Sequence, residues 1–188
     1  MEDAGDDYLE TTMRRSTLAF IATLLPALGI APTLRAQDQA EQARPCSSEE
    51  HRQFDFWIGE WEVVNTADDQ VVGQNTIRTV MNGCALEENW VGGQGGKGTS
   101  LNIYHVPSER WHQTWISDTG TFLLLDGGWK DGSMVLEGEM MGPGGGKVLH
   151  RIAWSPSESG EVRQIWEFSR DGGEAWTTAF DGTYRPKS

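Results

Sequence analysis

The chain has little basic charge, and this shortage excludes two kinds of partner. Its 188 residues include 15 lysines and arginines against 28 aspartates and glutamates, so the formal net charge is −13. A surface this acidic repels phosphate backbones and anionic lipids. We therefore expect neither nucleic acid nor a membrane surface as a partner. The composition leaves the oligomeric state open.

Long apolar runs are also scarce, and the main candidate lies near the N-terminus. Arg14 and Arg15 precede a mostly apolar run over residues 18–30, which is too short to span a hydrocarbon core of roughly 30 Å. This pattern is typical of a secretory signal peptide, and we place its end after Ala36. The acidic residues in front of it favour Met13 as the true start. The sequence thus predicts a secreted or periplasmic protein without membrane insertion; an internal helix of a cytosolic protein is the alternative.

Removing residues 1–36 takes away five acidic and three basic residues, which leaves 23 against 12 and a net charge of −11. Only two cysteines are present, Cys46 and Cys84, and both belong to this mature part. In an oxidising compartment they would form a disulfide that closes a loop of about 38 residues, worth about 4 kcal/mol in the chain-entropy model. We predict that it ties the segment before Trp57 to a strand. Two free thiols or a redox pair are the alternatives, although no Cys-x-x-Cys motif is present.

Helical periodicity nearly vanishes after Trp61, and the mature chain divides into two parts. Residues 37–52 are polar and predict a linker that ends in a short helix around Ser47–Phe54, with Ser47 or Ser48 as N-cap. Residues 53–188 predict one all-β domain, because short alternating runs are separated by Gly, Asp, Asn, Pro and Ser clusters. The expected strands are 60–66, 71–80, 84–91, 98–105, 111–117, 120–129, 133–141, 147–154, 161–169 and 175–185. About ten strands joined by tight turns predict an antiparallel up-and-down barrel.

The residue types of one hairpin turn predict both its type and its register. Asp131-Gly132 is typical of a type I′ turn, in which both residues need positive φ. The register that follows pairs Trp129 with Met134 and Gly127 with Leu136. It also puts one set of apolar side chains on a single face that we expect to be core: Leu123, Leu125, Met134, Leu136 and Met140.

Three further loops have distinctive residues. Residues 169–176 resemble an Asp-box, the Ser-x-Asp-x-Gly-x-Thr-Trp hairpin of sialidases, with Ala175 in place of the threonine. A single copy predicts a turn rather than an activity, with Asp171 accepting backbone hydrogen bonds and Trp176 packing beneath. The Gly-rich stretches 92–98 and 142–147 lack P-loop spacing. We expect them to be loops at a barrel end, where they can gate a pocket.

The two runs 98–105 and 110–117 alternate strictly and are joined by the turn 107–110. With a four-residue loop, Tyr104 pairs with Gln113 and Asn102 with Trp115. One face then combines aromatic and hydrogen-bonding side chains, the usual lining of a small-molecule pocket. We predict that this face binds a ligand through Ser100, Asn102, Tyr104, Trp111, Gln113 and Trp115. The other face is mostly apolar, so a barrel with that face inside is the alternative.

Metal ligation and catalysis have weaker support in the sequence. The same register sets His105 opposite His112, and the two could hold a metal ion or haem with His150 or a carboxylate. No third ligand has a defined spacing, so we predict no cofactor. Glu60, Glu62, Glu87 and Glu88 could converge on early strands, but no Gly-x-Ser-x-Gly motif occurs and an enzyme is not the favoured interpretation.

Several motifs appear in a fixed order along the chain: Phe54-Asp55-Phe56-Trp57-Ile58-Gly59-Glu60-Trp61-Glu62-Val63, then residues 83–90, 111–115 and 180–185. In this order they resemble a family of small exported bacterial proteins, a domain of unknown function with a lipocalin-like (calycin) barrel. The resemblance covers residues 46–185. It implies that Trp57 and Trp61 plug the barrel floor, and that Arg185 stacks on Trp61 through a cation–π contact.

Taken together, these patterns predict an exported barrel that binds a small apolar or aromatic molecule. Trp111, Trp115 and Tyr104 would form the walls, and Asn102 and Gln113 would orient the ligand. Two alternatives stay open. One is a haem- or metal-binding barrel using the three histidines; the other is a structural or interaction domain whose interior is simply filled.

Overall fold

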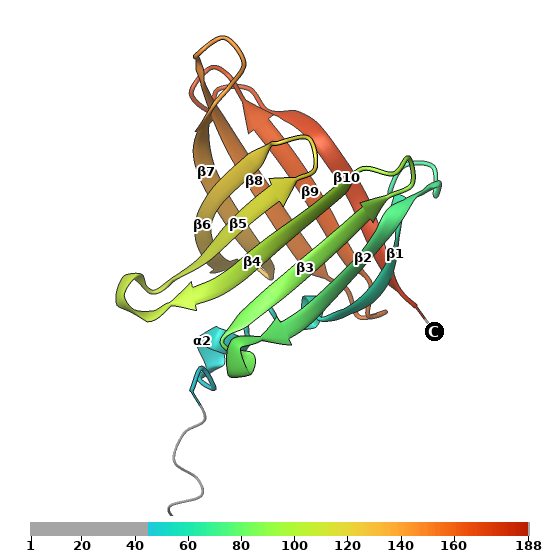
Figure 1. Ribbon diagram of the computed structural model, residues 1–188, viewed down its shortest axis with the longest axis vertical. Helices are drawn as coiled ribbons and strands as arrows, with labels where there is room; N and C mark the ends of the chain where they lie inside the picture. Colours follow the sequence, from blue (N-terminus) through green and yellow to red (C-terminus); the bar gives the residue numbers. More distant parts are fainter. Residues whose placement is uncertain (1–44, 188) are drawn as a thin grey trace, which may run out of the picture. The chain divides into compact units, whose positions relative to one another are not determined.

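The structure is a computed structural model that describes residues 45–187. The predicted signal peptide over 1–36, the start at Met13 and the first part of the linker lie outside the described residues. Within them, ten antiparallel strands form one closed barrel, and neighbours in sequence are neighbours in the sheet (Figure 1). The barrel closes where β1 pairs with β10. The predicted all-β, up-and-down fold is confirmed.

The strands follow the predicted segments to within two residues at each end. A short helix, α2 (Glu49–Arg52), and a 3₁₀ turn, η1 (Asp55–Trp57), precede them, and two further 3₁₀ turns are η2 (Met81–Gly83) and η3 (Val106–Ser108). The strands are β1 (Gly59–Asn65), β2 (Val71–Val80), β3 (Ala85–Gly92), β4 (Lys97–His105), β5 (Arg110–Ser117), β6 (Phe122–Lys130), β7 (Ser133–Met141), β8 (Lys147–Pro156), β9 (Val162–Ser169) and β10 (Thr177–Pro186).

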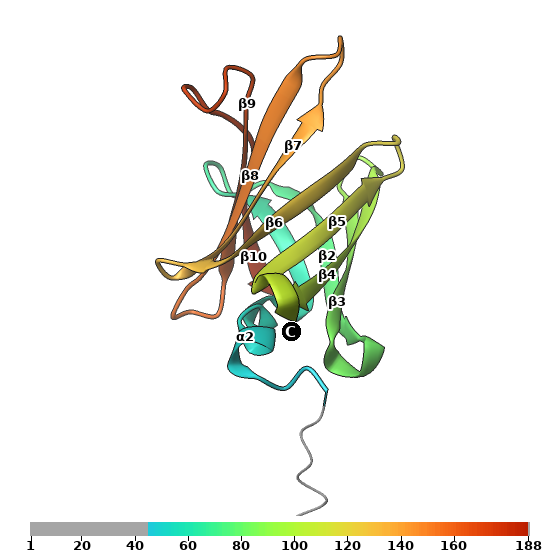
Figure 2. The same cartoon turned by 90° about the vertical axis from the view of Figure 1, so that its left-hand side faces the viewer.

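The two ends of the barrel differ. At one end, which we call the closed end, α2 and η1 lie across the opening beside the connections 81–84, 106–109, 131–132 and 157–161 (Figure 2). At the other end, which we call the rim, lie the five hairpin loops 66–70, 93–96, 118–121, 142–146 and 170–176. Both Gly-rich loops belong to the rim, as expected.

Aromatic side chains fill the closed end. Phe54 stacks on Trp57 with ring centroids 4.9 Å apart, and both are fully buried. Trp61 donates its indole N–H to the Trp57 carbonyl at 3.0 Å. Gly59 has a φ of 154°, and a Cβ there would lie 3.3 Å from the Trp61 ring, so glycine lets the backbone approach that ring. The predicted plug by Trp57 and Trp61 is therefore present.

Arg185 lies elsewhere than the resemblance implies. It pairs with Glu62 in the ladder between β1 and β10, one position along from the buried Tyr184, so its side chain points outward. Its guanidinium bonds Asp69 at 2.9 Å and Glu161 at 3.2 Å. Stacking on Trp61 was wrong, because Trp61 points inward and Arg185 outward on neighbouring strands.

The Cys46–Cys84 disulfide is present, with Cα atoms 4.9 Å apart. It ties the segment before α2 to the residue that precedes β3. Arg52 strengthens this connection by donating to the Gly83 carbonyl at 2.6 Å. The predicted staple between the N-terminal segment and the barrel is confirmed.

The two hairpin predictions had different outcomes. Asp131 and Gly132 both have positive φ, and Trp129 pairs with Met134 and Gly127 with Leu136, as predicted. In the β4–β5 hairpin, however, Tyr104 pairs with Trp111 and Asn102 with Gln113. The loop is Val106–Glu109, one residue earlier than expected, because η3 forms there and Glu109 takes a left-handed conformation. The pairing shifts by two residues, which leaves each side chain on its predicted face.

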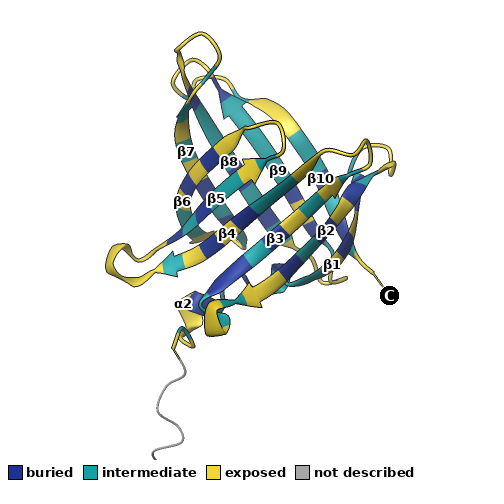
Figure 3. Cartoon of the chain, viewed as in Figure 1, coloured by how far each residue is buried: buried dark blue, intermediate teal, exposed yellow. Residues whose placement is uncertain are grey.

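Burial alternates along most strands, as Figure 3 shows by colour. The predicted core face of β6 and β7 is inside, with Leu123, Leu125, Met134 and Leu136 buried and Met140 partly so. Among the described residues, no helix is long and apolar enough to cross a membrane.

Candidate functional site

The face of the β4–β5 hairpin that points into the barrel is the one with mixed aromatic and polar side chains. Asn102 and Gln113 are buried, whereas Leu101 and Ile116 on the opposite face are 51% and 50% exposed. Trp115 lies against the interior cavity. The alternative barrel, with Leu101 and Ile116 inside, is therefore excluded.

The interior holds a cavity of about 180 Å³. Aromatic rings form most of its wall, and it reaches the exposed Ala179 near the start of β10, so it opens towards the rim. Trp154 separates it from the closed end, since its ring packs on Phe54 and Trp57 at 5.2 and 5.3 Å between centroids. The lining residues are Glu88, Trp90, Gln113, Trp115, Leu123, Ile152, Trp154, Gln164, Trp166, Ala179, Phe180 and Tyr184.

Three of the cavity's aromatic rings lie directly on glycines, two of them on a neighbouring strand and the third on the same strand. A Cβ on Gly98 would come within 2.1 Å of the Trp115 ring, and one on Gly73 within 2.5 Å of the Trp90 ring. Gly182 stands in the same relation to Phe180, at 2.5 Å. Any larger residue would displace these rings. The glycines therefore help to set the shape of the cavity wall.

A chain of buried hydrogen bonds runs along one side of the interior and leads to Glu88. Gln113 Nε2 donates to Asn102 Oδ1 at 2.7 Å, and Asn102 Nδ2 donates to Ser100 Oγ at 2.9 Å. Ser100 Oγ then donates to Glu88 Oε2 at 2.6 Å. All four side chains are at most 4% exposed. Every donor in this series points towards the carboxyl group.

The chain continues beyond Glu88 on its other side. Asn75 Nδ2 donates to Glu88 Oε1 at 2.7 Å and to the Tyr184 hydroxyl at 3.3 Å. Tyr184 in turn donates to Gln164 Oε1. The cavity wall thus contains a carboxyl group, two amides and a phenol that are positioned by packing and by one another.

Among the Asp, Glu, Lys and Arg residues that the structure describes, Glu88 is the one whose side chain is buried in the barrel interior. Burial raises its pKa from the ordinary 4.5 to about 7, and the hydrogen bonds from Ser100 and Asn75 partly oppose that rise. Tyr184 stays neutral at ordinary pH, because burial and the nearby Glu88 raise its pKa well above 10.

The six residues predicted to bind a ligand take three different positions. Gln113 and Trp115 line the cavity. Ser100 and Asn102 are buried behind it, in the hydrogen-bond chain. Trp111 and Tyr104 lie towards the closed end, where Trp111 packs on Phe54 and donates to the Glu50 carbonyl. The structure therefore brings only part of the predicted set to the cavity.

Sequence reasoning missed most of the wall, including Trp90, Trp154, Trp166, Phe180 and Glu88. One available signal was the alternation Leu86, Glu88, Trp90, which puts a glutamate between two apolar residues on one face of β3. Because the chain contains 28 acidic residues, this pattern alone did not distinguish Glu88 from the exposed carboxylates.

The histidines do not form a common site. His105 pairs with Arg110 in the ladder and bonds Ser108, while His150 on β8 accepts a bond from Trp166 at 3.1 Å. The predicted apposition of His105 and His112 was wrong, because of the two-residue shift at the hairpin. Within residues 45–187, no group of three or more His, Cys, Asp or Glu side chains could hold a metal ion.

His112 makes an arrangement of its own on the outer wall. Its Nδ1 lies 3.0 Å from Asp126 Oδ1 and its Nε2 lies 2.9 Å from Thr114 Oγ1. The order of groups matches that of a hydrolytic triad, but the surrounding amides pair within the sheet ladder, so none is free to act as an oxyanion donor. The three side chains therefore resemble a triad in order only.

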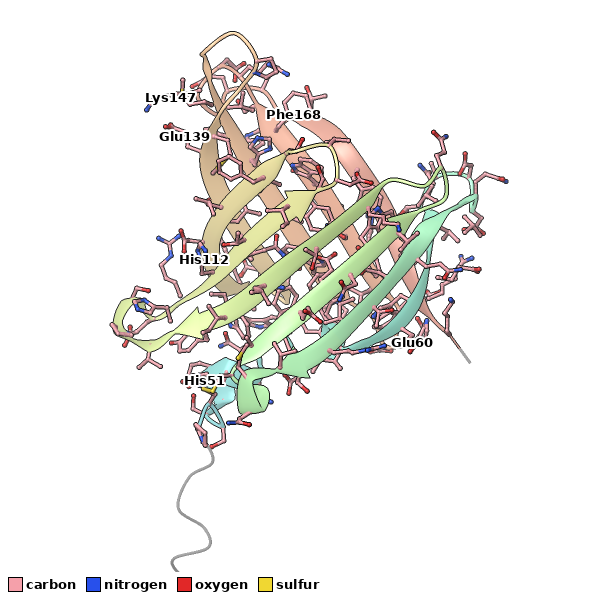
Figure 4. All side chains as sticks on the ribbon, in the orientation of Figure 1. His51, Glu60, His112, Glu139, Lys147 and Phe168 are labelled. Atoms are coloured by element: carbon pink, nitrogen blue, oxygen red, sulfur yellow. A yellow bond between two sulfur atoms is a disulfide. The ribbon has the colours of Figure 1, made fainter. Side chains whose placement is uncertain are left out.

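The carboxylates of the early strands do not converge either. Glu60 and Glu62 are exposed on β1, Glu87 points away from the interior, and Glu88 alone points inward. Figure 4 shows Glu60 and His112 on widely separated parts of the wall. These four glutamates therefore do not form the paired carboxylates that glycoside hydrolysis needs.

The Asp-box forms a structured turn at the rim. Asp171 Oδ1 accepts hydrogen bonds from the Ala175 backbone amide at 3.0 Å and from Ser169 Oγ at 2.7 Å. The hydrogen bond from the Ala175 amide holds the Asp171 pKa below its ordinary value. The Arg151 guanidinium lies 4.2 Å above the Trp176 ring. These contacts support the structural interpretation of the motif.

A scan of the chain against protein-family models finds no match, and a search of curated proteins finds no similar sequence. The barrel itself is consistent with a lipocalin-like fold.

Proposed function

We propose that the barrel binds a small molecule inside its cavity. The observation that carries this proposal is a cavity of about 180 Å³ whose wall combines five tryptophan and phenylalanine rings with four polar side chains already fixed in position. A domain whose interior served only as core would bury these rings against one another. Binding sites for small molecules typically combine apolar walls with a few oriented polar groups.

The closed end and the rim have different roles in this proposal. Phe54, Trp57 and Trp61 fill the closed end, so the ligand enters past the loops of the rim. Trp115 and Trp166 provide apolar contact, and Gln113 and Gln164 orient polar groups of the ligand.

Intrinsic tryptophan fluorescence tests the proposal, because four of the nine tryptophans line the cavity. We expect saturable quenching by at least one compound from a panel of small aromatics, lipids, sterols, haem and sugars. Trp115→Ala should weaken that binding about tenfold, since it removes roughly 1.4 kcal/mol of apolar contact. Trp129→Ala is the matched control: Trp129 is 41% exposed, does not line the cavity and packs on Phe56. No saturable quenching by any compound, or equal losses in both variants, would contradict the proposal.

We also propose that the protein is exported and belongs to the family of small exported bacterial barrels that its motifs resemble. The disulfide between Cys46 and Cys84 supports this, because disulfides persist mainly in oxidising compartments. N-terminal sequencing of the protein from its native cells should find a mature chain that starts close to Gln37. A chain that keeps residues 13–36 in the cytoplasmic fraction would argue against export.

A further inference from the structure

The cavity contains one ionisable carboxyl group and no cationic side chain to balance it. Among the lining residues, Glu88 and Tyr184 are the titratable ones, and none is Lys, Arg or His. Each ion pair of the described barrel is formed by other residues. Figure 4 shows one example near the rim, Lys147 with Glu139. A buried carboxylate without a cation is costly, so a positively charged ligand would be favoured there.

The hydrogen bonds around Glu88 suit the ionised form of the carboxyl group. Ser100 and Asn75 each donate to one of its oxygens. Because a carboxylate offers about four acceptor positions, roughly two remain for a ligand. Ser100 Oγ itself accepts from Asn102 Nδ2, so its hydroxyl proton is left for Glu88. The site is therefore arranged to accept further donors.

The rest of the wall suits an organic cation better than an inorganic one. Trp90, Trp115, Trp154, Trp166 and Phe180 surround the same space as Glu88. Aromatic faces attract ammonium groups and also bind apolar carbon. A metal ion would instead need several oxygen, nitrogen or sulfur ligands, and the described residues contain no such group.

The size of the cavity limits what can bind. A cavity of about 180 Å³ is close to the roughly 150 Å³ of an apolar cavity that holds benzene. One ring or a short alkyl chain with an ammonium group fills it. The net charge of −13 favours the approach of such cations and opposes anions.

We propose, building on the proposed small-molecule function, that the ligand is a small organic ammonium ion whose charged group binds Glu88 and whose apolar part lies among the cavity's tryptophans. Tyr184, Asn75 and Gln164 add neutral hydrogen-bonding groups around the same position. Carboxylate oxygens and aromatic ring faces, the two kinds of group that attract an ammonium ion, are thus both present in the wall.

Calorimetric titration with three probes of similar size tests this inference: benzylamine, benzyl alcohol and benzoate. At about pH 8, where Glu88 is ionised and benzylamine is protonated, benzylamine should bind at least about tenfold more tightly than benzyl alcohol, and benzoate more weakly than either. Glu88→Gln should abolish the preference for the amine over the alcohol. Glu87→Gln removes a charge from the adjacent, outward-facing position and should leave the preference intact.

The outcomes separate this inference from the proposed function. Equal affinity for amine and alcohol, or an amine preference that survives Glu88→Gln, overturns the inference and leaves a cavity for neutral molecules. Absence of binding by all three probes and by the fluorescence panel overturns both.

The pH dependence of binding by the wild-type protein is a second test, which does not depend on whether a variant folds. Tyr184 on β10 is the other titratable group facing Glu88, and the side chains that contact Glu88 from β2 and β4 are the uncharged Asn75 and Ser100. Amine affinity should therefore rise relative to alcohol affinity between about pH 5.5 and about pH 8, as the Glu88 carboxyl loses its proton. A ratio that does not change with pH overturns the inference.

Discussion

Glu88 reduces the stability of the barrel at neutral pH, because the folded chain holds its proton more tightly than the unfolded chain. Between pH 4.5 and about 7, folded Glu88 is protonated while the unfolded residue has already lost its proton. The free energy of unfolding therefore falls as pH rises through this window and levels off above it. The difference in pKa corresponds to about 3 kcal/mol.

Glu88→Gln should remove this pH dependence. Relative to the variant, the wild-type protein should lose about 2–3 kcal/mol of unfolding free energy between about pH 5 and about pH 8. Urea unfolding at the two pH values, for both proteins, measures the difference directly, and effects of the other carboxylates cancel. Parallel curves for the two proteins would show that Glu88 is not buried as described.

Gly98 tests whether the cavity wall depends on ring positions. Gly98→Ala would place a Cβ within 2.1 Å of the Trp115 ring, which must then move. We expect probe affinity to fall about tenfold and the free energy of unfolding by about 1–3 kcal/mol from overpacking. Gly96→Ala is the control, because a Cβ there meets no atom within 4 Å. Fluorescence titration that finds unchanged binding in Gly98→Ala would contradict this account of the wall.

The segment that covers the closed end depends on its disulfide. Without the Cys46–Cys84 bond, a loop with a sequence separation of 38 is released in the unfolded chain, so the free energy of unfolding should fall by about 4 kcal/mol. Urea unfolding with and without a reducing agent measures this loss. A Cys46→Ala/Cys84→Ala double variant should be insensitive to the reducing agent; an equal response in that variant would mean that the loss has another cause.

The hairpins show which parts of the strands could be predicted from sequence. Asp131-Gly132 fixes its turn type through positive φ at both positions, so the register of β6 and β7 followed correctly. The β4–β5 turn has no such pair. There the left-handed residue is Glu109, which has no sequence signal for that conformation, and the register came out two residues wrong.

The barrel as a whole was predictable because most strands alternate and turn residues separate them along the chain. The cavity was less so, because its wall is assembled from strands far apart in sequence. Trp90, Trp154 and Phe180 meet across the interior, and no local pattern shows that they share one space. The sequence predicted which face of the β4–β5 hairpin binds a ligand, and that face does point inward. Only Gln113 and Trp115 from it reach the cavity.

The most direct test of cavity binding is ¹⁹F NMR of protein labelled with 5-fluorotryptophan, with each of the nine resonances assigned by substitution. Titration with the tightest-binding probe should shift the four signals from the cavity wall, those of Trp90, Trp115, Trp154 and Trp166. The five remaining signals should move little. Shifts confined to those five, or no shift at a saturating probe concentration, would contradict binding inside the barrel.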